Sequence, residues 1–140
     1  MTCRVIGHDM SELEEIVKRH MVSWGYEVKH LPPGGSYPDF LAVRGLDAVF
    51  VEVKGANDRV DFDQGLRMTR LARAGHTVYV AKEEGNEIAY CKGALVIDTL
   101  DVSMGRELFR VRKDDPKAVK ITAGHALDTE HYSRYWKDSP

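Results

Sequence analysis

Three ionisable side chains in the first half of the chain have the types and the spacing that phosphate chemistry needs. Pro38-Asp39 is followed, after twelve intervening residues, by Glu52-Val53-Lys54. Mg²⁺ binds to one or two carboxylates and keeps several waters, which leaves room for phosphate oxygens. Asp39 and Glu52 can supply the carboxylates, and the peptide carbonyl of Val53 can supply a third oxygen. Lys54 can orient or deprotonate an attacking water and stabilise charge on the phosphate.

A β-hairpin is predicted to carry these residues. Residues 40–43 form a short apolar run, and residues 48–54 form a second run rich in β-branched and aromatic residues, with a Gly-containing turn between them. Side chains alternate between the two faces of a strand. Glu52 and Lys54 therefore project from the same face, while the valines of the second run face the opposite layer. Asp39, at the start of the neighbouring strand, can reach the same place as Glu52.

A helix is predicted on each side of this hairpin. Ser11 and Glu14 form an S-x-x-E capping box at the start of the first helix, and Gly25 is typical of a helix end. Residues 26–30 then form a strand or an extended approach to the hairpin.

The second helix is predicted to start at Asp61 or Asp63 as its N-cap and to end at Gly75, before a buried strand over residues 76–82. The apolar residues expected on its buried face are Phe62, Leu66, Leu71 and Ala74. Farther along the chain we predict short strands at 88–91 and 95–97, a hairpin over 107–122 and a terminal helix over 127–136.

The motif and its surroundings resemble the PD-(D/E)XK nucleases, the restriction-endonuclease-like superfamily. Pro38-Asp39 and Glu52-Val53-Lys54 fit the signature residue for residue, and the order of the predicted elements is the core order of that superfamily. The segment from Gln64 to Val80 is most similar to the VRR-NUC branch, where a Gln follows the Lys strand by about this distance. The resemblance covers residues 11–82. It implies an α/β fold with a mixed central sheet flanked by helices in the order αβββαβ, extended by a C-terminal β-rich segment over 83–140.

The resemblance also implies roles for individual residues. Asp39 and Glu52, with the carbonyl of Val53, would bind Mg²⁺, for which Mn²⁺ could substitute. Lys54 would position the water, and Gln64 would hydrogen-bond a metal-bound water or a phosphate oxygen. Gln64 can also be read as an ordinary helix residue.

Many members of the superfamily place a Glu on the first helix to complete the metal site. Glu14 is the candidate in this chain, with Glu12 and Glu15 as alternatives. The competing interpretation is that Glu14 only closes the capping box.

The net charge of −2 does not indicate a nucleic-acid-binding protein, so basic residues near the site have to supply any contact with DNA. The candidates are Arg59, in the loop after the hairpin, and Arg67, Arg70 and Arg73, which recur along the second helix. Basic helix faces can bind a phosphate backbone, although such a row is more often a solvated surface.

The composition predicts one domain of 140 residues with a real core, because 43% of the residues are hydrophobic. No apolar run reaches the length of a membrane span, and the first residues lack a signal-peptide pattern. Cys3 and Cys91 form neither a disulfide framework nor a zinc site, and the six histidines show no ligand spacing. We therefore expect a cytoplasmic protein that does not contact a membrane.

From these observations we predict a Mg²⁺-dependent endonuclease that hydrolyses DNA phosphodiester bonds. By resemblance to VRR-NUC proteins and Holliday-junction resolvases, its substrate would be branched or flapped DNA, as in DNA repair and recombination. We also expect a homodimer, with contacts from Gly85 onward. Two alternatives stay open: a sequence-specific restriction-type endonuclease, and an inactive nucleic-acid-binding or assembly module of the same fold.

Overall fold

The computed structural model describes residues 11–32, 37–92, 95–97, 101–103 and 106–122. Most of its strands join one seven-stranded sheet in the order β1-β2-β3-β4-β5-β8-β9, and β6 and β7 form a separate two-stranded sheet. The strands are β1 (Glu27–His30), β2 (Phe40–Arg44), β3 (Asp47–Lys54), β4 (Thr77–Glu84), β5 (Glu87–Lys92), β6 (Leu95–Ile97), β7 (Asp101–Ser103), β8 (Arg106–Arg112) and β9 (Asp115–Ile121).

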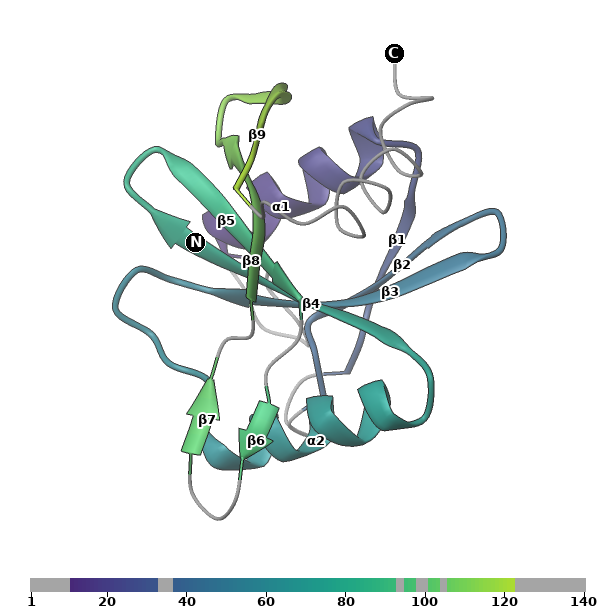
Figure 1. Cartoon of the computed structure of the whole chain (residues 1–140). Helices are drawn as coiled ribbons and strands as arrows, with labels where there is room; N and C mark the ends of the chain where they lie inside the picture. Colours follow the sequence, from purple (N-terminus) through teal and green to yellow (C-terminus); the bar gives the residue numbers. More distant parts are fainter. Residues whose placement is uncertain (1–10, 33–36, 93–94, 98–100, 104–105, 123–140) are drawn as a thin grey trace, which may run out of the picture.

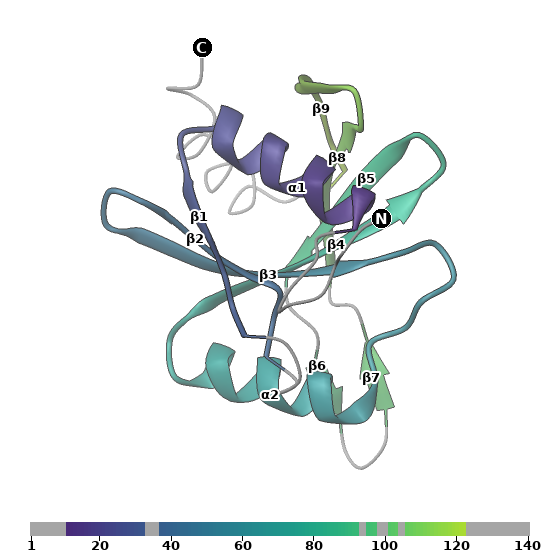
Figure 2. The same ribbon diagram turned by 180° about the vertical axis from the view of Figure 1, so that it is seen from behind.

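The two helices of the described chain cover opposite faces of the large sheet. Helix α1 (Glu12–Ser23) lies on one face, and helix α2 (Phe62–Arg73) lies on the other (Figure 1). The view from behind shows the same arrangement, with β6 and β7 beside α2 (Figure 2). The predicted α/β fold with a mixed central sheet flanked by helices is thus confirmed, as is the αβββαβ order of its first six elements.

Within the large sheet, β3 and β4 are the one parallel pair, and every other neighbouring pair is antiparallel. A parallel pair needs a crossover connection, because the chain must return to the end of the sheet where it started. Helix α2 is that crossover between β3 and β4. The chain therefore forms a β-α-β unit that carries three of the predicted site residues: Glu52 and Lys54 on β3, and Gln64 on α2.

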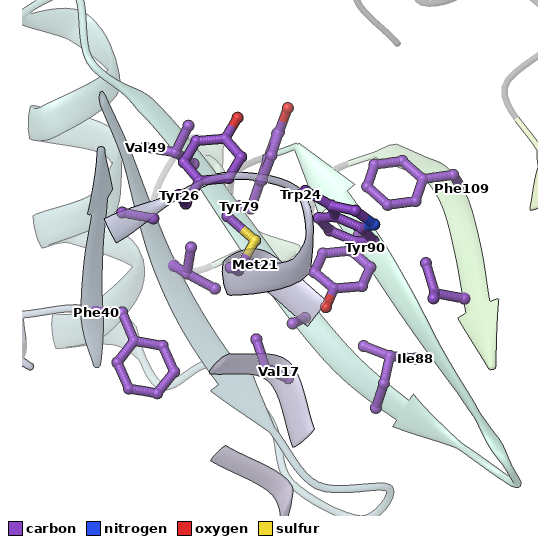
Figure 3. Close-up of a cluster of buried hydrophobic side chains, with 14 of the residues drawn as sticks. Val17, Met21, Trp24, Tyr26, Phe40, Val49, Tyr79, Ile88, Tyr90 and Phe109 are labelled. Carbon is purple, nitrogen blue, oxygen red and sulfur yellow. The ribbon is translucent and has the colours of Figure 1, made fainter. Parts of the chain in front are cut away.

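The larger core lies between α1 and the sheet. Val17, Met21 and Trp24 face inward from successive turns of α1 and are at most 4% exposed. They pack on side chains from both halves of the chain, among them Phe40, Val49, Tyr79, Ile88, Tyr90 and Phe109 (Figure 3). The rings of Tyr90 on β5 and Phe109 on β8 stack with centroids 4.8 Å apart. Strands β5 and β8, which lie beyond residue 82, thus share one hydrophobic core with residues 11–82.

A buried histidine links α1 to the far end of the sheet. His20 Nδ1 lies 2.8 Å from the hydroxyl of Tyr90, and its Nε2 lies 3.0 Å from the carbonyl oxygen of Arg112. Burial lowers the pKa of His20 below its usual value, although its backbone hydrogen bonds act in the opposite direction. His20 is therefore a hydrogen-bonded part of the core.

The smaller core lies between α2 and the opposite face of the sheet, and it corrects one expectation. The buried residues of α2 are Gly65, Met68 and Thr69, whereas Phe62 is 41% exposed and Ala74 is exposed. Predicted positions Leu66 and Leu71 are half-buried. The expectation holds for Leu71, which packs against the smaller core, and is wrong for Phe62 and Ala74, because Gly65, Met68 and Thr69 occupy the centre of the contact.

The predicted helix ends are confirmed. Ser11 and Glu14 form a complete capping box, and Asp61 rather than Asp63 caps α2. Gly25 and Gly75 follow the helices with φ of 94° and 98°, a conformation that glycine adopts without strain. The strands predicted in the second half of the chain are present.

The helix predicted over residues 127–136 lies outside the described residues. Neither α1 nor α2, the helices of the described part of the chain, has the length and apolar character needed to cross a membrane.

Candidate metal-dependent active site

The carboxyl end of β3 brings the predicted site residues together. β3 runs three residues past its last pair with β2, while its other edge stays paired with β4 to the end of the strand. Asp39 fills the edge that β2 leaves open, since the N–H of Val53 donates to Asp39 Oδ2 over 2.8 Å. The N–H and C=O of one residue in an extended strand point to the same side. The carbonyl oxygen of Val53 therefore points toward Asp39 as well.

Glu52, Lys54 and Gln64 form a closed triangle of polar contacts on the α2 face of the sheet. Lys54 Nζ lies 3.3 Å from Glu52 Oε2 and donates to Gln64 Oε1 over 2.7 Å. Gln64 Nε2 donates to Glu52 Oε2 over 3.1 Å. The side chains of Lys54 and Glu52 are only 11% and 5% exposed, and buried charges are stable only when they are paired and hydrogen-bonded. The predicted alternation along β3 is confirmed by these contacts.

Gln64 is held in place by the start of its own helix. Its backbone N–H donates to Asp61 Oδ1 over 2.8 Å, and its Oε1 accepts from the N–H of Asp61 over 3.3 Å. This capping box satisfies N–H groups that otherwise lack partners at a helix start. The same Gln64 amide therefore closes the helix cap and contacts Lys54 and Glu52.

The pKa values of both carboxyl groups at this site are raised above their ordinary values. Burial raises the pKa of Asp39, and the neighbouring Glu14 raises it further, against the lowering effect of the Val53 N–H. Burial also raises the pKa of Glu52, with the charge of Asp39 as the second cause. Burial is thus the main cause of both shifts, and a neighbouring acidic side chain adds to each of them: Glu14 beside Asp39, and Asp39 beside Glu52.

The donor set fits a hard divalent cation. A cation beside Asp39 and Glu52 would offset the cost of burying their negative charge, which is the main cause of their raised pKa values. Both carboxylates and the Val53 carbonyl offer oxygen ligands. The described residues contain no group of three or more His, Cys, Asp or Glu side chains in ligand geometry. Two carboxylates and a carbonyl suit Mg²⁺, which keeps several of its waters, better than a metal that requires an all-protein cage.

Among the three glutamates of the first helix turn, Glu14 is the one that faces this site. Its charge and a side-chain hydrogen bond raise the pKa of Asp39, and its charge also raises the pKa of Glu52. Glu12 and Glu15 are exposed. Glu14 Oε1 also accepts from the N–H of Ser11 over 3.0 Å. The capping interaction and the position beside Asp39 are therefore compatible.

The four predicted DNA-binding arginines differ in their exposure and in their distance along the chain from Gln64. Arg67 is half-buried and lies one helical turn beyond Gln64, on the side of the helix that carries the site. Arg70 and Arg73 are exposed in the last turn of α2, and Arg59 is exposed in the loop before the helix. Arg67 is thus placed differently from the other three.

Two residues near the site were missed from the sequence. Tyr37, two positions before Asp39, packs against Arg67. Lys82, the pairing partner of Lys54 on β4, donates to the carbonyl oxygens of Ala56 at 3.1 Å and Asp58 at 3.3 Å. It fixes the loop that follows β3. The adjacency of Lys82 follows from the parallel β3–β4 register, which periodicity alone does not supply.

No family model matches the chain, and no curated protein matches it in sequence. Among solved structures, the chain is similar to Hjc, a Holliday junction resolvase from the archaeal hyperthermophile Archaeoglobus fulgidus. The two share 19% sequence identity with a TM-score of 0.48, over 56% of this chain and 74% of the other. A likeness this distant does not assign an activity.

Proposed function

We propose that this chain is a divalent-metal-dependent endodeoxyribonuclease of the PD-(D/E)XK kind. The observation that carries the proposal is the convergence of Asp39, Glu52, Lys54 and Gln64 at the carboxyl end of β3. Two carboxyl groups whose pKa values are raised chiefly by burial, with an ammonium group beside them, form an arrangement that is typical of functional sites. The Gln64 contacts also agree with the sequence resemblance to the VRR-NUC branch.

Asp39, Glu52 and the Val53 carbonyl would hold Mg²⁺ or Mn²⁺, with Glu14 beside Asp39. When bound, the cation would lower the pKa of a coordinated water and offset the charge of the phosphodiester. Lys54 Nζ orients the attacking water and stabilises negative charge on the phosphate.

Gln64 keeps Lys54 and Glu52 in a fixed relation to each other, because its amide contacts both side chains. A catalytic group that is held in position before the substrate arrives loses less entropy in the reaction.

We infer that the substrate is branched DNA. The regular structure of the described residues consists of one seven-stranded sheet, the two helices that cover it and the small β6–β7 sheet, so these residues include no separate module for reading a base sequence. A branched substrate can be recognised through its shape and its phosphate backbone. With DNA as substrate, the site of action would be intracellular.

The decisive experiment is a panel of end-labelled DNAs: duplex, flap, splayed arm, four-way junction and single strand, each with Mg²⁺, Mn²⁺ or EDTA. We expect metal-dependent cuts near the branch point and none in EDTA. Discrete cuts in linear duplex at one sequence would favour the restriction-type alternative. Binding without any cleavage in either metal would favour the inactive binding module.

We also propose a homodimer, since two active sites can cut two strands of one junction in fixed relation. β9 is an outer strand of the sheet, and Ile121 on it is 48% exposed. An outer strand offers unpaired backbone groups to a second chain. Light scattering at micromolar concentration should show two 15.8 kDa chains per particle. A monomer would contradict the dimer and shift weight toward flap cleavage or nicking.

A further inference from the structure

We propose that Tyr37 and Arg67 form a platform on which one DNA base, next to the bond that is cut, stacks. This inference rests on the proposed nuclease function and adds a substrate-positioning element to it. Neither the signature motif nor the polar triangle at the end of β3 includes these two residues.

The pair has a defined geometry. The guanidinium carbon of Arg67 lies 4.4 Å from the centroid of the Tyr37 ring, and Arg67 Nη1 donates to the Tyr37 hydroxyl over 3.3 Å. A guanidinium group so close to an aromatic face is a cation–π contact. The Arg67 head group is therefore held in one place by two contacts with the same ring.

Tyr37 is not explained by the hydrophobic core. It belongs to neither cluster of buried side chains, and it is 47% exposed. Tyr is enriched at binding surfaces because it presents a large apolar ring together with a hydroxyl group, so Tyr37 is a candidate for binding a partner. Since Arg67 covers part of the ring, the remaining ring surface is open to a flat partner.

The pair lies beside the candidate site through two separate connections. Tyr37 is joined by Pro38 to Asp39, which accepts from the Val53 N–H. Arg67 lies one helical turn from Gln64, whose amide contacts Glu52 and Lys54. A group held by Tyr37 and Arg67 is therefore close to a phosphate held by the carboxylates.

The chemistry of the pair matches a nucleotide. Aromatic rings bind single-stranded nucleic acid by stacking on bases, with little preference for sequence. A guanidinium group presents several N–H donors in a planar fork that suits phosphate oxygens. The platform would thus hold a base that is unstacked from its neighbours, as at a branch point, and Arg67 would contact the adjoining phosphate.

The test combines protein variants with DNA that lacks single bases. The probe is a fluorescein-labelled four-way junction in EDTA, with an abasic site placed at each position near the branch in turn. Tyr37→Leu is expected to weaken binding of the intact junction about tenfold, the size of one lost stacking contact. It should leave affinity unchanged for the DNA that is abasic at the stacked position. Tyr37→Phe, which keeps the ring, should bind nearly as the wild type does.

Arg67→Met provides a second variant, and Arg73→Met on the same helix is its matched control. Arg67→Met should lower the slope of log Kd against log salt concentration by about one, as expected for one lost phosphate contact. Arg73→Met should change it less. In cleavage assays with Mg²⁺, Tyr37→Leu should raise KM and leave kcat nearly unchanged.

A measurement on wild-type protein keeps the inference testable even where a variant does not fold. The fluorescence of 2-aminopurine at the stacked position should be quenched on binding, because it would lie against Tyr37. Absence of quenching at every position near the branch would overturn the inference, as would equal loss of affinity by Tyr37→Leu on intact and all abasic DNAs. Either result leaves the nuclease proposal standing if the wild type still cuts. A wild-type protein that neither binds nor cuts any DNA would overturn both.

Discussion

Gln64 Oε1 accepts a 2.7 Å hydrogen bond from Lys54 Nζ while the same oxygen accepts from the N–H of Asp61 at 3.3 Å. The amide that closes the start of α2 is thus also a partner of the proposed catalytic lysine. A change at Gln64 should therefore affect both stability and activity, whereas a change at Asp61 should affect mainly stability.

We expect Gln64→Ala to reduce cleavage at least tenfold, because Lys54 and Glu52 both lose a partner, and to lower the free energy of unfolding by about 1 kcal/mol. Asp61→Ala is the matched control. It removes the cap but leaves the Gln64 amide, so it should cost a similar free energy of unfolding, about 1 kcal/mol, with a smaller loss of activity. Urea unfolding and plasmid nicking measure the two quantities. Equal loss of activity in both variants would mean that Gln64 acts only through the helix.

Asp39→Asn and Glu52→Gln should each abolish metal-dependent cleavage and leave the fold intact. Both changes keep the shape of the side chain, and an amide oxygen at position 39 can still accept from the Val53 N–H. DNA binding in EDTA should survive or tighten, since negative charge near the phosphate is lost. Calorimetric titration with Mn²⁺ should show weaker metal binding. Cleavage at the wild-type rate by either variant would show that the substituted residue is not a metal ligand.

Lys54→Met should reduce kcat about 10²-fold or more, the range for loss of a positioned acid–base group or an electrostatic stabiliser. Metal affinity should change less than in the two carboxylate variants. Single-turnover cleavage and Mn²⁺ titration separate the two effects. If the variant binds metal poorly but cleaves at the wild-type rate when the metal is saturating, Lys54 is instead a structural partner of Glu52.

Stability without metal should depend on pH through the two carboxyl groups. The pKa of Asp39 is raised from 3.8 to about 6 and that of Glu52 from 4.5 to about 8. The folded protein then holds these protons more tightly than the unfolded chain, so their contribution to the free energy of unfolding falls as the pH rises through this range. His20 acts in the opposite direction up to its ordinary value of 6.5, because burial lowers its pKa.

The comparison of wild type with an Asp39→Asn, Glu52→Gln double variant cancels the effect of His20. In EDTA, the melting temperature of the wild type should fall relative to the variant between about pH 4, near the ordinary pKa values of the two groups, and about pH 8, the raised pKa of Glu52. Added Mg²⁺ should raise the wild-type melting temperature more at the upper end of this range, where protons no longer compete. Parallel curves for the two proteins would contradict the raised pKa values.

Local patterns in the sequence were sufficient for the hairpin, the helix caps and the side of β3 that carries Glu52 and Lys54. Each depends on residues close in the chain: alternation along a strand, or a side chain that bonds a backbone group three residues away. The buried face of α2 was predicted only in part, at Leu71, because Gly65 and Thr69 lie at its centre, and neither side chain is hydrophobic enough to be predicted as buried.

The contacts that the sequence did not supply are those between distant segments. Tyr37 meets Arg67 across 30 positions, and Lys82 reaches the loop at Ala56 across 26 positions. Such pairs depend on the sheet register and on the direction of the crossover helix, which a single sequence does not encode in any short pattern. For the same reason, the inclusion of β5, β8 and β9 in the one large sheet could not be predicted.

The shared role of Gln64 has a consequence for local unfolding. Fraying of the first turn of α2 opens the cap and withdraws the side-chain amide of Gln64 from Lys54 and Glu52. The proposed active site is therefore complete only while that turn is closed. Local openings of this kind are observed as hydrogen exchange of individual amides. Metal that binds at the end of β3 should therefore slow hydrogen exchange of the backbone N–H of Gln64, which donates to Asp61. This effect is expected although Gln64 supplies none of the proposed ligands. The exchange rate at one helix start would then report how often the site is complete.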